Sequence, residues 1–424
     1  MYKDDRKFGN LYNKRDVGGI KMTGILSGLK VLDLTQNIAG PVSTQLLGDL
    51  GATVIKVEKP GDGDDTRNWG NVSTTGESGA FMAVNRNKKS ICIDLRQQKG
   101  IELVYELASQ VDIFVHSMKP ETAEKKGLSY EKIKEINPSI IYGSISAFGE
   151  IGPMKALPGY DPLIQAYTGI MSVTGNAGED PVRVGVSIND MGSGMWLTMG
   201  ILAALYKRNL TGEGSKVSNS LLETGVAWGS LQLSTYMETG KVPQKLGTAM
   251  PLISPYEAFK ANDGWVMIAA GNNRLFGNLC KVLNIDEIAQ DEKFVTNGQR
   301  LSNRYELHDL LEVETQKYSA DALVELLRKG GVPCSPINTL DKLLTDEQVN
   351  VMGLIKPVEH SRVKDFKIVD LPLTINDERS SVQNLPPLLG EHSEDVLKEF
   401  GLTDEQIEAL LADSVIGVLD KVGR

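Results

Sequence analysis

The stretch that decides the fold is KVLDLTQNIAGPVSTQLLGDLGATVIKVEKP, residues 30–60. Its two ends, KVLDL and TVIKVEKP, are short runs rich in β-formers, and PVSTQLLGDLG between them predicts a helix that ends at Gly51. A strand, a helix and a second strand predict two parallel strands joined by a right-handed crossover. Ligands of such sheets bind at the carboxyl ends of the strands, so we expect the site there.

The same alternation continues along the chain. Further strands are expected in residues 89–95, 112–118 and 139–149, and helices in residues 99–110 and from about Met191 to Lys207. Later segments predict a β-hairpin over 254–271, a helix-rich region over 273–330 and two short C-terminal helices, the second opened by a capping box of Thr403 and Gln406. These patterns predict an α/β protein.

The expected layout has five parts. Residues 1–21 are a loose N-terminal extension, 22–225 a large Rossmann-like α/β domain, 226–250 a linker, 251–340 a smaller α+β domain, and 341–424 a linker with a C-terminal return to the large domain. A chain of 424 residues is too long for one ordinary core, which supports at least two domains.

Composition excludes several classes of protein. The net charge of −10 argues against a nucleic-acid partner, and no apolar run reaches the roughly 20 residues that span a membrane. The N-terminal residues lack the apolar core of a secretory signal. Three distant cysteines without a CxxC pair are typical of a reducing compartment, so we expect a cytoplasmic protein.

Three kinds of site are not supported by the motifs. The turn TQNIAGP has one glycine where a dinucleotide site needs several, although Glu58 ends the second strand where a ribose-binding acid would lie. GDGDD at 61–65 lacks the later ligands of a calcium loop, so its acids are expected to cap turns. The four histidines show no metal-ligand spacing, and His116 is expected to pack at a strand end. We therefore predict no metal and no tightly bound cofactor.

Basic residues recur near the predicted strand ends, and two interpretations stay open. Lysines usually lie on a solvated surface, but the same residues could form a phosphate-binding rim on an acidic protein. The residues concerned are Lys59, Arg67, Lys88, Lys89, Arg96, Lys119 and Lys125.

Asp190 precedes a long apolar helix, within GVSINDMGSGM at 185–195. An aspartate here is a favoured N-cap, which stabilises a helix by about 1 kcal/mol. Gly192 and Gly194 nevertheless disfavour the first turn, unless something approaches the backbone closely or their N–H groups serve a developing oxyanion. The residues alone favour the cap.

The chain resembles the class III CoA-transferases, which include formyl-CoA and carnitine CoA-transferases, from Gly28 to about Gly417. The resemblance rests on the order and spacing of several motifs. These are residues 28–67, NRNKKSICIDL (85–95), KKGLSYEKIKEINPSIIYGSISAFG (125–149), PGYDPLIQAYTGIMSVTG (158–175), VGVSINDMGSGMWLTMGILAALYKR (184–208) and PPLLGEHSEDVLKEFGL (386–402).

The resemblance implies that Asp190 is a nucleophile, with Gly192 and Gly194 as backbone donors to the oxyanion. The aspartate would form a mixed anhydride with the acyl group of a donor and then an aspartyl-CoA thioester. Implied CoA contacts are Ile38, Ala39, Lys59, Ile93, Asp94, Leu95, Arg96, Ser117, Met118, Lys119 and Lys125. HSMKPETAEKKG at 116–127 departs from the family pattern by carrying lysine for arginine, which loses the bidentate fork.

The resemblance also implies partners and an alternative activity. It implies an interlocked homodimer, with acyl-CoA and a small carboxylate as substrates. KLGTAMPLISPYEAF at 245–259 lacks the poly-glycine lid of formyl-CoA transferases, whereas PVRVGVSINDM (181–191), SPYEAF (254–259) and IAAGNNRLF (268–276) resemble the dicarboxylate-using branch. The related α-methylacyl-CoA racemases carry a GHD motif. Here Gly159-Tyr160-Asp161 replaces it, so a base that works at neutral pH is missing and Tyr160 is expected to line the CoA channel.

Overall fold

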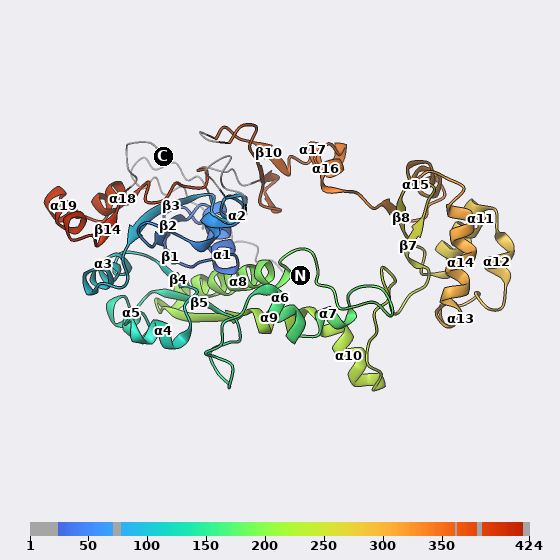
Figure 1. Cartoon of the computed structure of the whole chain (residues 1–424), viewed down its shortest axis with the longest axis horizontal. Coiled ribbons are helices and arrows are strands. Elements are labelled where there is room, and N and C mark those ends of the chain that lie inside the picture. The colour runs from blue at the N-terminus through green and yellow to red at the C-terminus, as the bar shows by residue number, and fades with distance from the viewer. Residues whose placement is uncertain (1–23, 71–77, 361–362, 380–383, 419–424) are drawn as a thin grey trace, which may run out of the picture.

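The computed structural model describes residues 24–70, 78–360, 363–379 and 384–418. Two lobes lie side by side and are joined by two long segments of chain (Figure 1). The larger lobe holds both ends of the described chain, and the smaller lobe holds its middle part. The α/β fold class predicted from the sequence is confirmed.

A seven-stranded sheet forms the centre of the larger lobe, in the order β14-β3-β2-β1-β4-β5-β6. The strands β1 to β6 run parallel, and β14 pairs with β3 in the antiparallel direction. The order reverses between β1 and β4, which is where ligands of doubly wound sheets bind. The strands are β1 (Lys30–Leu34), β2 (Thr53–Glu58), β3 (Lys88–Ile93), β4 (Ile113–His116), β5 (Ile141–Ser146), β6 (Ser215–Ser220) and β14 (Ile416–Gly417).

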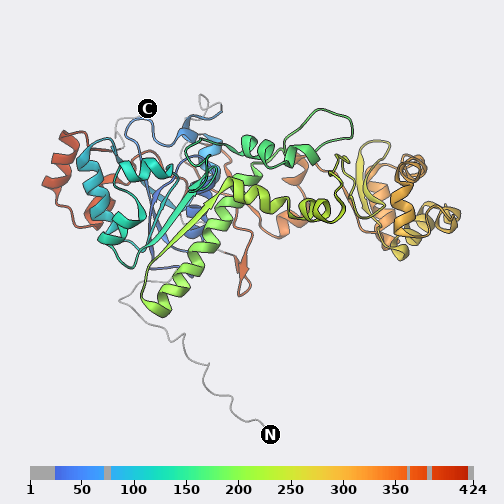
Figure 2. The ribbon, with the colours of Figure 1, turned by 90° about the horizontal axis from the view of Figure 1, so that it is seen from below.

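Helices cover both faces of this sheet because alternate strand residues point to opposite sides. Leu32, Ile55 and Ile91 face a core closed by α3 (Gln98–Ala108), α5 (Tyr130–Ile136), α18 (Ser393–Glu399) and α19 (Asp404–Ala412). Val31 and Val54 face a second core closed by α1 (Ala39–Asp49) and the long α8 (Ile188–Thr211), which Figure 2 shows beside the sheet.

Shorter helices complete this lobe at the ends of the strands. They are η1 (Asp65–Asn68), α2 (Gly79–Val84), α4 (Pro120–Lys125), α6 (Asp161–Tyr167), α7 (Ile170–Val173), α9 (Leu221–Trp228) and α10 (Ser230–Thr239). The helix α10 lies inside the segment 226–250 that was expected to be a linker.

The smaller lobe has its own apolar core, formed within residues 259–332. Its antiparallel sheet contains the expected hairpin of β7 (Tyr256–Lys260) and β8 (Trp265–Ala269), joined by β9 (Cys334–Pro336). Five helices pack on it: α11 (Asn273–Leu283), α12 (Asp286–Gln290), α13 (Asn297–Ser302), α14 (Arg304–Thr315) and α15 (Ala320–Lys329).

The chain then returns to the larger lobe, where α18, α19 and β14 pack against the large sheet. Ser393 fixes this return, because its Oγ accepts a hydrogen bond from the Cys92 backbone at 3.1 Å and donates one to the Gly417 carbonyl at 2.6 Å. The predicted capping box of Thr403 and Gln406 is present. The return contains α16 (Leu340–Leu343), α17 (Glu347–Val351), β10 (Ile355–Pro357), β11 (Lys367–Val369), β12 (Thr374–Ile375) and β13 (Glu378–Arg379).

Other parts of the predicted layout stay predictions. The domain boundaries and the interlocked homodimer are not tested by one chain, and the extension 1–21 lies outside the described residues. Within the described ranges, no helix is both long and apolar enough to cross a membrane.

Candidate active site

Asp190 lies inside the first turn of α8 and does not cap it. The helix begins at Ile188 after Ser187, three residues earlier than expected. The Asn189 N–H donates to Asp161 Oδ1 at 2.7 Å, and the Met191 N–H donates to the Ser187 carbonyl at 3.0 Å. The cap interpretation is therefore wrong, because the helix has already started before Asp190 and other groups take its first donors.

The Asp190 carboxyl group is partly buried and hydrogen-bonds to none of the described residues. Burial and then the nearby Asp161 carboxylate raise its pKa to about 7. Asp161 itself is buried in α6, where its Oδ2 accepts a hydrogen bond from Gln165 Nε2 at 2.5 Å. The fold thus keeps one acid fully bonded and leaves its neighbour unpaired, as a nucleophile requires.

The two glycines after Asp190 allow α8 to approach its neighbours. A Cβ on Gly194 would lie 2.7 Å from the Ala39 carbonyl oxygen, and one on Gly192 would lie 2.6 Å from the Trp228 ring. Both glycines lie within α8, where a regular helix directs each N–H to the carbonyl four residues earlier. Packing therefore explains these glycines, and their oxyanion role stays a prediction.

The contact at Gly194 also places the first turn of α8 against the start of α1. Ile38 is the N-cap of α1 and Ala39 its first residue, and both come from the turn that follows β1. The contact residue Gly194 lies one helical turn after the predicted nucleophile, so α8 brings Asp190 to within about a turn of the start of α1, although Asp190 and Ala39 are 151 positions apart in the sequence (190 − 39).

A pocket of about 260 Å³ lies at the carboxyl ends of the strands, at the switch between β1 and β4. Gln36 and Ser117 join the two strand ends through a 2.9 Å hydrogen bond from the Gln36 N–H to Ser117 Oγ. The lining residues are Leu34, Gln36, Val57, Glu58, Lys59, Ile93, Asp94, Leu95, Arg96, Ser117, Met118, Thr122 and Lys126. Most of the CoA contacts predicted from the sequence are in this set.

The pocket rim is basic, and we define it as Lys59, Arg96 and Lys126. Lys59 pairs with Asp62, Arg96 pairs with Asp94 at 2.8 Å, and Lys126 Nζ donates to the Leu95 carbonyl at 2.8 Å. The hydrogen bond from Arg96 holds the pKa of Asp94 far below its usual value. Cations grouped at one edge of an acidic protein suit a phosphorylated ligand.

Several predicted contacts do not line this pocket. Ile38 and Ala39 lie in the adjoining turn and helix start, whereas Lys119 and Lys125 belong to the two ends of α4. Tyr160 is the N-cap residue of α6, and 55% of its surface is exposed. Conversely, Gln36, Thr122 and Lys126 line the pocket and were not predicted. Gln36 offered a signal, because it is the second residue after the end of β1.

Two of the basic residues lie neither on a solvated surface nor on a phosphate-binding rim, the two interpretations that the sequence left open. Lys88 is completely buried, and its Nζ bonds to Asp33 Oδ2 at 3.1 Å, Asn85 Oδ1 at 2.9 Å and the Pro41 carbonyl at 3.0 Å. Arg67 is mostly buried and pairs with Glu58 at 2.7 Å. Both side chains are therefore internal ion-pair partners, a correction that also removes Glu58 as a ribose-binding candidate.

Lys56 extends this internal network. Its Nζ bonds to Asp64 Oδ2 and to the Thr35 carbonyl, each at 2.9 Å. Burial alone would lower the pKa of Lys56, but Asp64 and Asp33 raise it above its usual value. Asp64 also caps the turn at Thr66, as expected for the acidic loop. We call Asp33, Lys56, Asp64 and Lys88 the inner cluster.

His116 packs at the end of β4, as expected. Its Nδ1 accepts the Met118 N–H at 3.1 Å, and its Nε2 lies 2.7 Å from the Tyr142 hydroxyl. Burial lowers the pKa of His116 to about 4, so the ring is neutral and shapes the segment 117–118 that lines the pocket. The described residues contain no cluster of three or more potential metal ligands.

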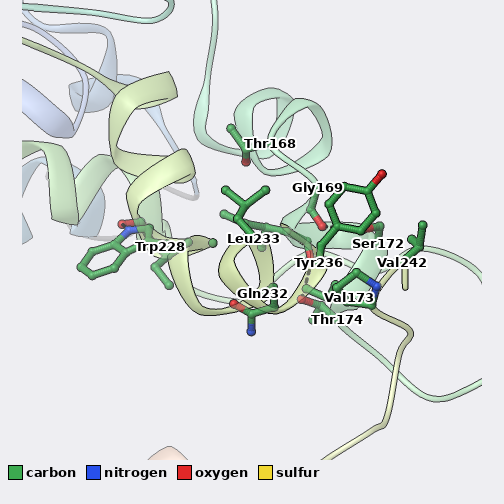
Figure 3. Close-up of a pocket in the computed structure, with 14 residues that line it drawn as sticks. Thr168, Gly169, Ser172, Val173, Thr174, Trp228, Gln232, Leu233, Tyr236 and Val242 are labelled. Carbon is green, nitrogen blue, oxygen red and sulfur yellow. Dashed lines mark hydrogen bonds between the residues drawn. The ribbon is translucent and has the colours of Figure 1, made fainter. Parts of the chain in front are cut away.

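A second, larger hollow of about 380 Å³ is mostly apolar (Figure 3). It lies between α7 and α10, and Leu233, Tyr236 and Trp228 form much of its wall. Ile188 connects it to the first turn of α8. It contains no residue predicted from the sequence as a CoA contact, so we place the candidate CoA site at the sheet edge.

A comparison with protein families finds a match over most of the chain. The family model of CoA-transferase family III matches residues 26–393. The chain belongs to CoA-transferase family III. Membership establishes the enzyme class, a CoA-transferase that acts on CoA thioesters.

Members of the family resemble the chain over most of its length. Succinyl-CoA:glutarate CoA-transferase of Mus musculus is 40% identical over 392 residues, covering 92% of this chain and 90% of the relative. Acetyl-CoA:oxalate CoA-transferase of Acetobacter aceti is 37% identical over 318 residues, covering 75% and 82%. The crystal structure of a CAIB/BAIF family protein from Brucella suis matches with a TM-score of 0.80 and 37% identity, covering 89% of this chain and 100% of that one.

Proposed function

We propose that this enzyme transfers CoA from an acyl-CoA to a small dicarboxylate, with Asp190 as the nucleophile. The Asp190 carboxylate attacks the thioester carbonyl, CoA thiolate leaves, and a mixed anhydride forms. The thiolate then attacks the aspartyl carbonyl, which releases the donor acid and leaves an aspartyl-CoA thioester. The acceptor carboxylate reverses both steps, so that CoA moves without hydrolysis.

The observation that carries this proposal is the unpaired, partly buried Asp190 carboxyl group next to the turn after β1. A carboxylate acts as a nucleophile only if it is not tied up in an ion pair, and a site with little water protects an anhydride from hydrolysis. Two facts support these conditions: Asp190 has no hydrogen-bond partner among the described residues, and it is partly buried one helical turn before the α1–α8 contact at Gly194.

The pocket at the sheet edge supports binding of CoA in an orientation that reaches Asp190. Its basic rim suits the phosphates of the nucleotide end. The turn formed by Gln36, Ile38 and Ala39 leads from the pocket to the first turn of α8. We infer that the nucleotide end lies in the pocket and the thioester end lies at Asp190.

The dicarboxylate acceptor is inferred from the relatives, since one acts on succinyl-CoA and glutarate and another on acetyl-CoA and oxalate. Tyr160 favours transfer over racemisation, because a tyrosine hydroxyl is a poor base at neutral pH. A cytoplasmic location is part of this proposal and is supported by the free thiols of Cys92, Cys280 and Cys334.

A second copy of the chain is the proposed partner. Large apolar side chains are exposed along one stripe of α8, at Met191, Met195 and Met199, and on α10 beside the apolar hollow of Figure 3. Contiguous exposed apolar surface of this kind marks an interface. A homodimer would cover this surface next to Asp190.

Trapping the intermediate tests the proposal. We would incubate the purified enzyme with acetyl-, succinyl- or formyl-CoA and hydroxylamine, which converts an activated carboxyl group to a hydroxamate, and locate the product by peptide mass spectrometry. We expect the hydroxamate on Asp190. The Asp190→Ala variant should form no hydroxamate and transfer no CoA, yet still bind acyl-CoA, because the carboxylate is needed for the chemistry.

Two outcomes would contradict the assignment. Transfer by Asp190→Ala would exclude Asp190 as the nucleophile. Exchange of the α-proton of a branched acyl-CoA in heavy water, without any hydroxamate, would indicate the racemase activity instead.

A further inference from the structure

A dicarboxylate acceptor creates an electrostatic problem at Asp190. The reacting carboxylate of the acceptor has to approach Asp190, and the Asp161 carboxylate lies close enough to raise the pKa of Asp190. The second carboxylate of the acceptor therefore enters a region that already carries negative charge. Without a cation nearby, such a site would favour monocarboxylates over dicarboxylates.

Arg183 is placed to supply that cation. The next residue, Val184, donates its N–H to Gln165 Oε1 at 2.8 Å, and Gln165 Nε2 donates to Asp161 Oδ2 at 2.5 Å. The other oxygen of Asp161 accepts the Asn189 N–H at 2.7 Å. One bonded chain thus fixes the segment that carries Arg183 beside the first turn of α8.

The Arg183 side chain is exposed and has no hydrogen-bond or ion-pair partner among the described residues. Lys245 provides a contrast in the same neighbourhood, because its Nζ donates to the carbonyls of Glu179 at 2.8 Å and Asp180 at 2.7 Å. The cation that is seven positions before the nucleophile is therefore free, whereas this nearby lysine is engaged in holding the loop.

We propose that Arg183 binds the second carboxylate of the acceptor and so selects dicarboxylates. A guanidinium group matches a carboxylate with two parallel hydrogen bonds, which a lysine does not provide. This inference rests on the proposed function, since it assigns a specificity residue to that reaction. Arg183 takes no part in the bond-making steps at Asp190.

Steady-state kinetics with two matched acceptors test the proposal. Glutarate and pentanoate have the same chain length and differ in the second carboxylate. With acetyl-CoA as donor, Arg183→Gln should raise the KM for glutarate roughly 10- to 100-fold, the effect of losing a charge-assisted contact. The kcat for glutarate and the KM values for pentanoate and acetyl-CoA should stay within about 3-fold, because only the second carboxylate loses its partner.

Two further variants distinguish a specific contact between Arg183 and the acceptor from a general effect of lost charge or misfolding. Arg183→Lys should give an intermediate KM for glutarate. Lys241→Gln, which removes an exposed charge four positions before Lys245, should leave that KM within about 3-fold. An unchanged KM for glutarate in Arg183→Gln would overturn the proposal, whatever happens with pentanoate. An equal rise in the KM for acetyl-CoA would overturn it too, by assigning Arg183 to CoA.

Failure of the proposed function would look different. If the wild-type enzyme transferred no CoA to glutarate from acetyl-, succinyl- or formyl-CoA, the proposed reaction would be contradicted, and the role of Arg183 with it. If the wild-type enzyme uses glutarate and the variant behaves identically, only the role of Arg183 is excluded.

Discussion

Two groups of charges belong to the large sheet and the turns beside it, and they differ in what surrounds them. The inner cluster of Asp33, Lys56, Asp64 and Lys88 is almost completely inaccessible to solvent, and its members bond to one another, to carbonyls and to hydroxyls. The pocket rim is partly exposed, and each of its cations has at most one acidic partner on the surface or a single carbonyl.

The difference separates stability from binding. A charge in the inner cluster is already paired and lies out of reach of any ligand, so it can only hold the turns after β1 and β2 in place. A charge on the rim is solvated and can exchange a weak internal partner for a phosphate. The same residue types therefore have different roles because of burial.

The sharpest test of the comparison is Lys88→Met, for which we expect the largest change. Removing Lys88 leaves the buried Asp33 carboxylate without the cation that bonds to it directly, and should lower the free energy of unfolding by about 3–5 kcal/mol. The measurement is urea unfolding at pH 7. The neighbouring Lys89→Met is the matched control, since Lys89 is partly exposed and pairs with Glu399 on the surface.

The control variant Lys89→Met should lower the free energy of unfolding by less than about 1 kcal/mol, because its ion pair lies on the surface. If the two variants lost equal stability, the inner cluster would not be the stabilising element that its burial indicates.

Asp190→Asn should raise the stability of the protein, by less than Lys88→Met lowers it. Asp190 is partly buried but has no cation, and its pKa of about 7 in the folded protein exceeds the value of 3.8 for an unperturbed aspartate. An acid whose pKa is raised by folding costs stability above the unfolded pKa, and the cost increases until the pH passes the folded pKa. The variant should thus be more stable than the wild type at pH 8, with a free energy of unfolding that is higher by about 1–3 kcal/mol.

The advantage of Asp190→Asn should decrease as the pH falls from 8 towards 4, because wild-type Asp190 is then protonated in the folded protein. Thermal unfolding across this pH range would show it. A destabilised variant at pH 8 would mean that Asp190 has a stabilising partner and is not a free nucleophile.

Arg96→Gln should have the smallest effect on stability. The Arg96 side chain is 71% exposed, although its partner Asp94 is mostly covered. Because solvent screens the exposed guanidinium group, the free energy of unfolding should change by less than about 1 kcal/mol. The KM for acyl-CoA should nevertheless rise about 10-fold, because a phosphate contact is lost.

Lys99→Gln is the control for this variant, since Lys99 forms a surface pair with Asp413 outside the pocket. An equal rise in KM for both variants would show that general charge, and not the rim, attracts CoA.

The sequence predicted much of the fold because its signals are local. Periodicity and turn residues located β1 to β5, the hairpin of the smaller lobe and the capping box at Thr403. Family motifs located Asp190 and most residues of the pocket at the sheet edge. The strand β14 was missed, because two residues carry no periodic pattern and the strand exists only through its pairing with β3.

Only the tertiary structure shows which residues that are distant in the sequence lie next to each other. The letters KK at 88–89 do not say which lysine is buried. Lys88 is the buried one because its side chain points to the face of the sheet that carries Asp33, 55 positions away, and bonds to it. The glycines after Asp190 were visible in the sequence, but their fit against Ala39 and Trp228 was not.

The sequence by itself therefore determined the alternation of strands and helices and the enzyme family, and it singled out Asp190 as the proposed nucleophile. The tertiary structure decided which charges are structural and which are available, because desolvation and pairing depend on what the rest of the chain packs against each side chain. That packing buries Lys88 and leaves the carboxyl group of Asp190 and the guanidinium group of Arg183 unpaired among the described residues.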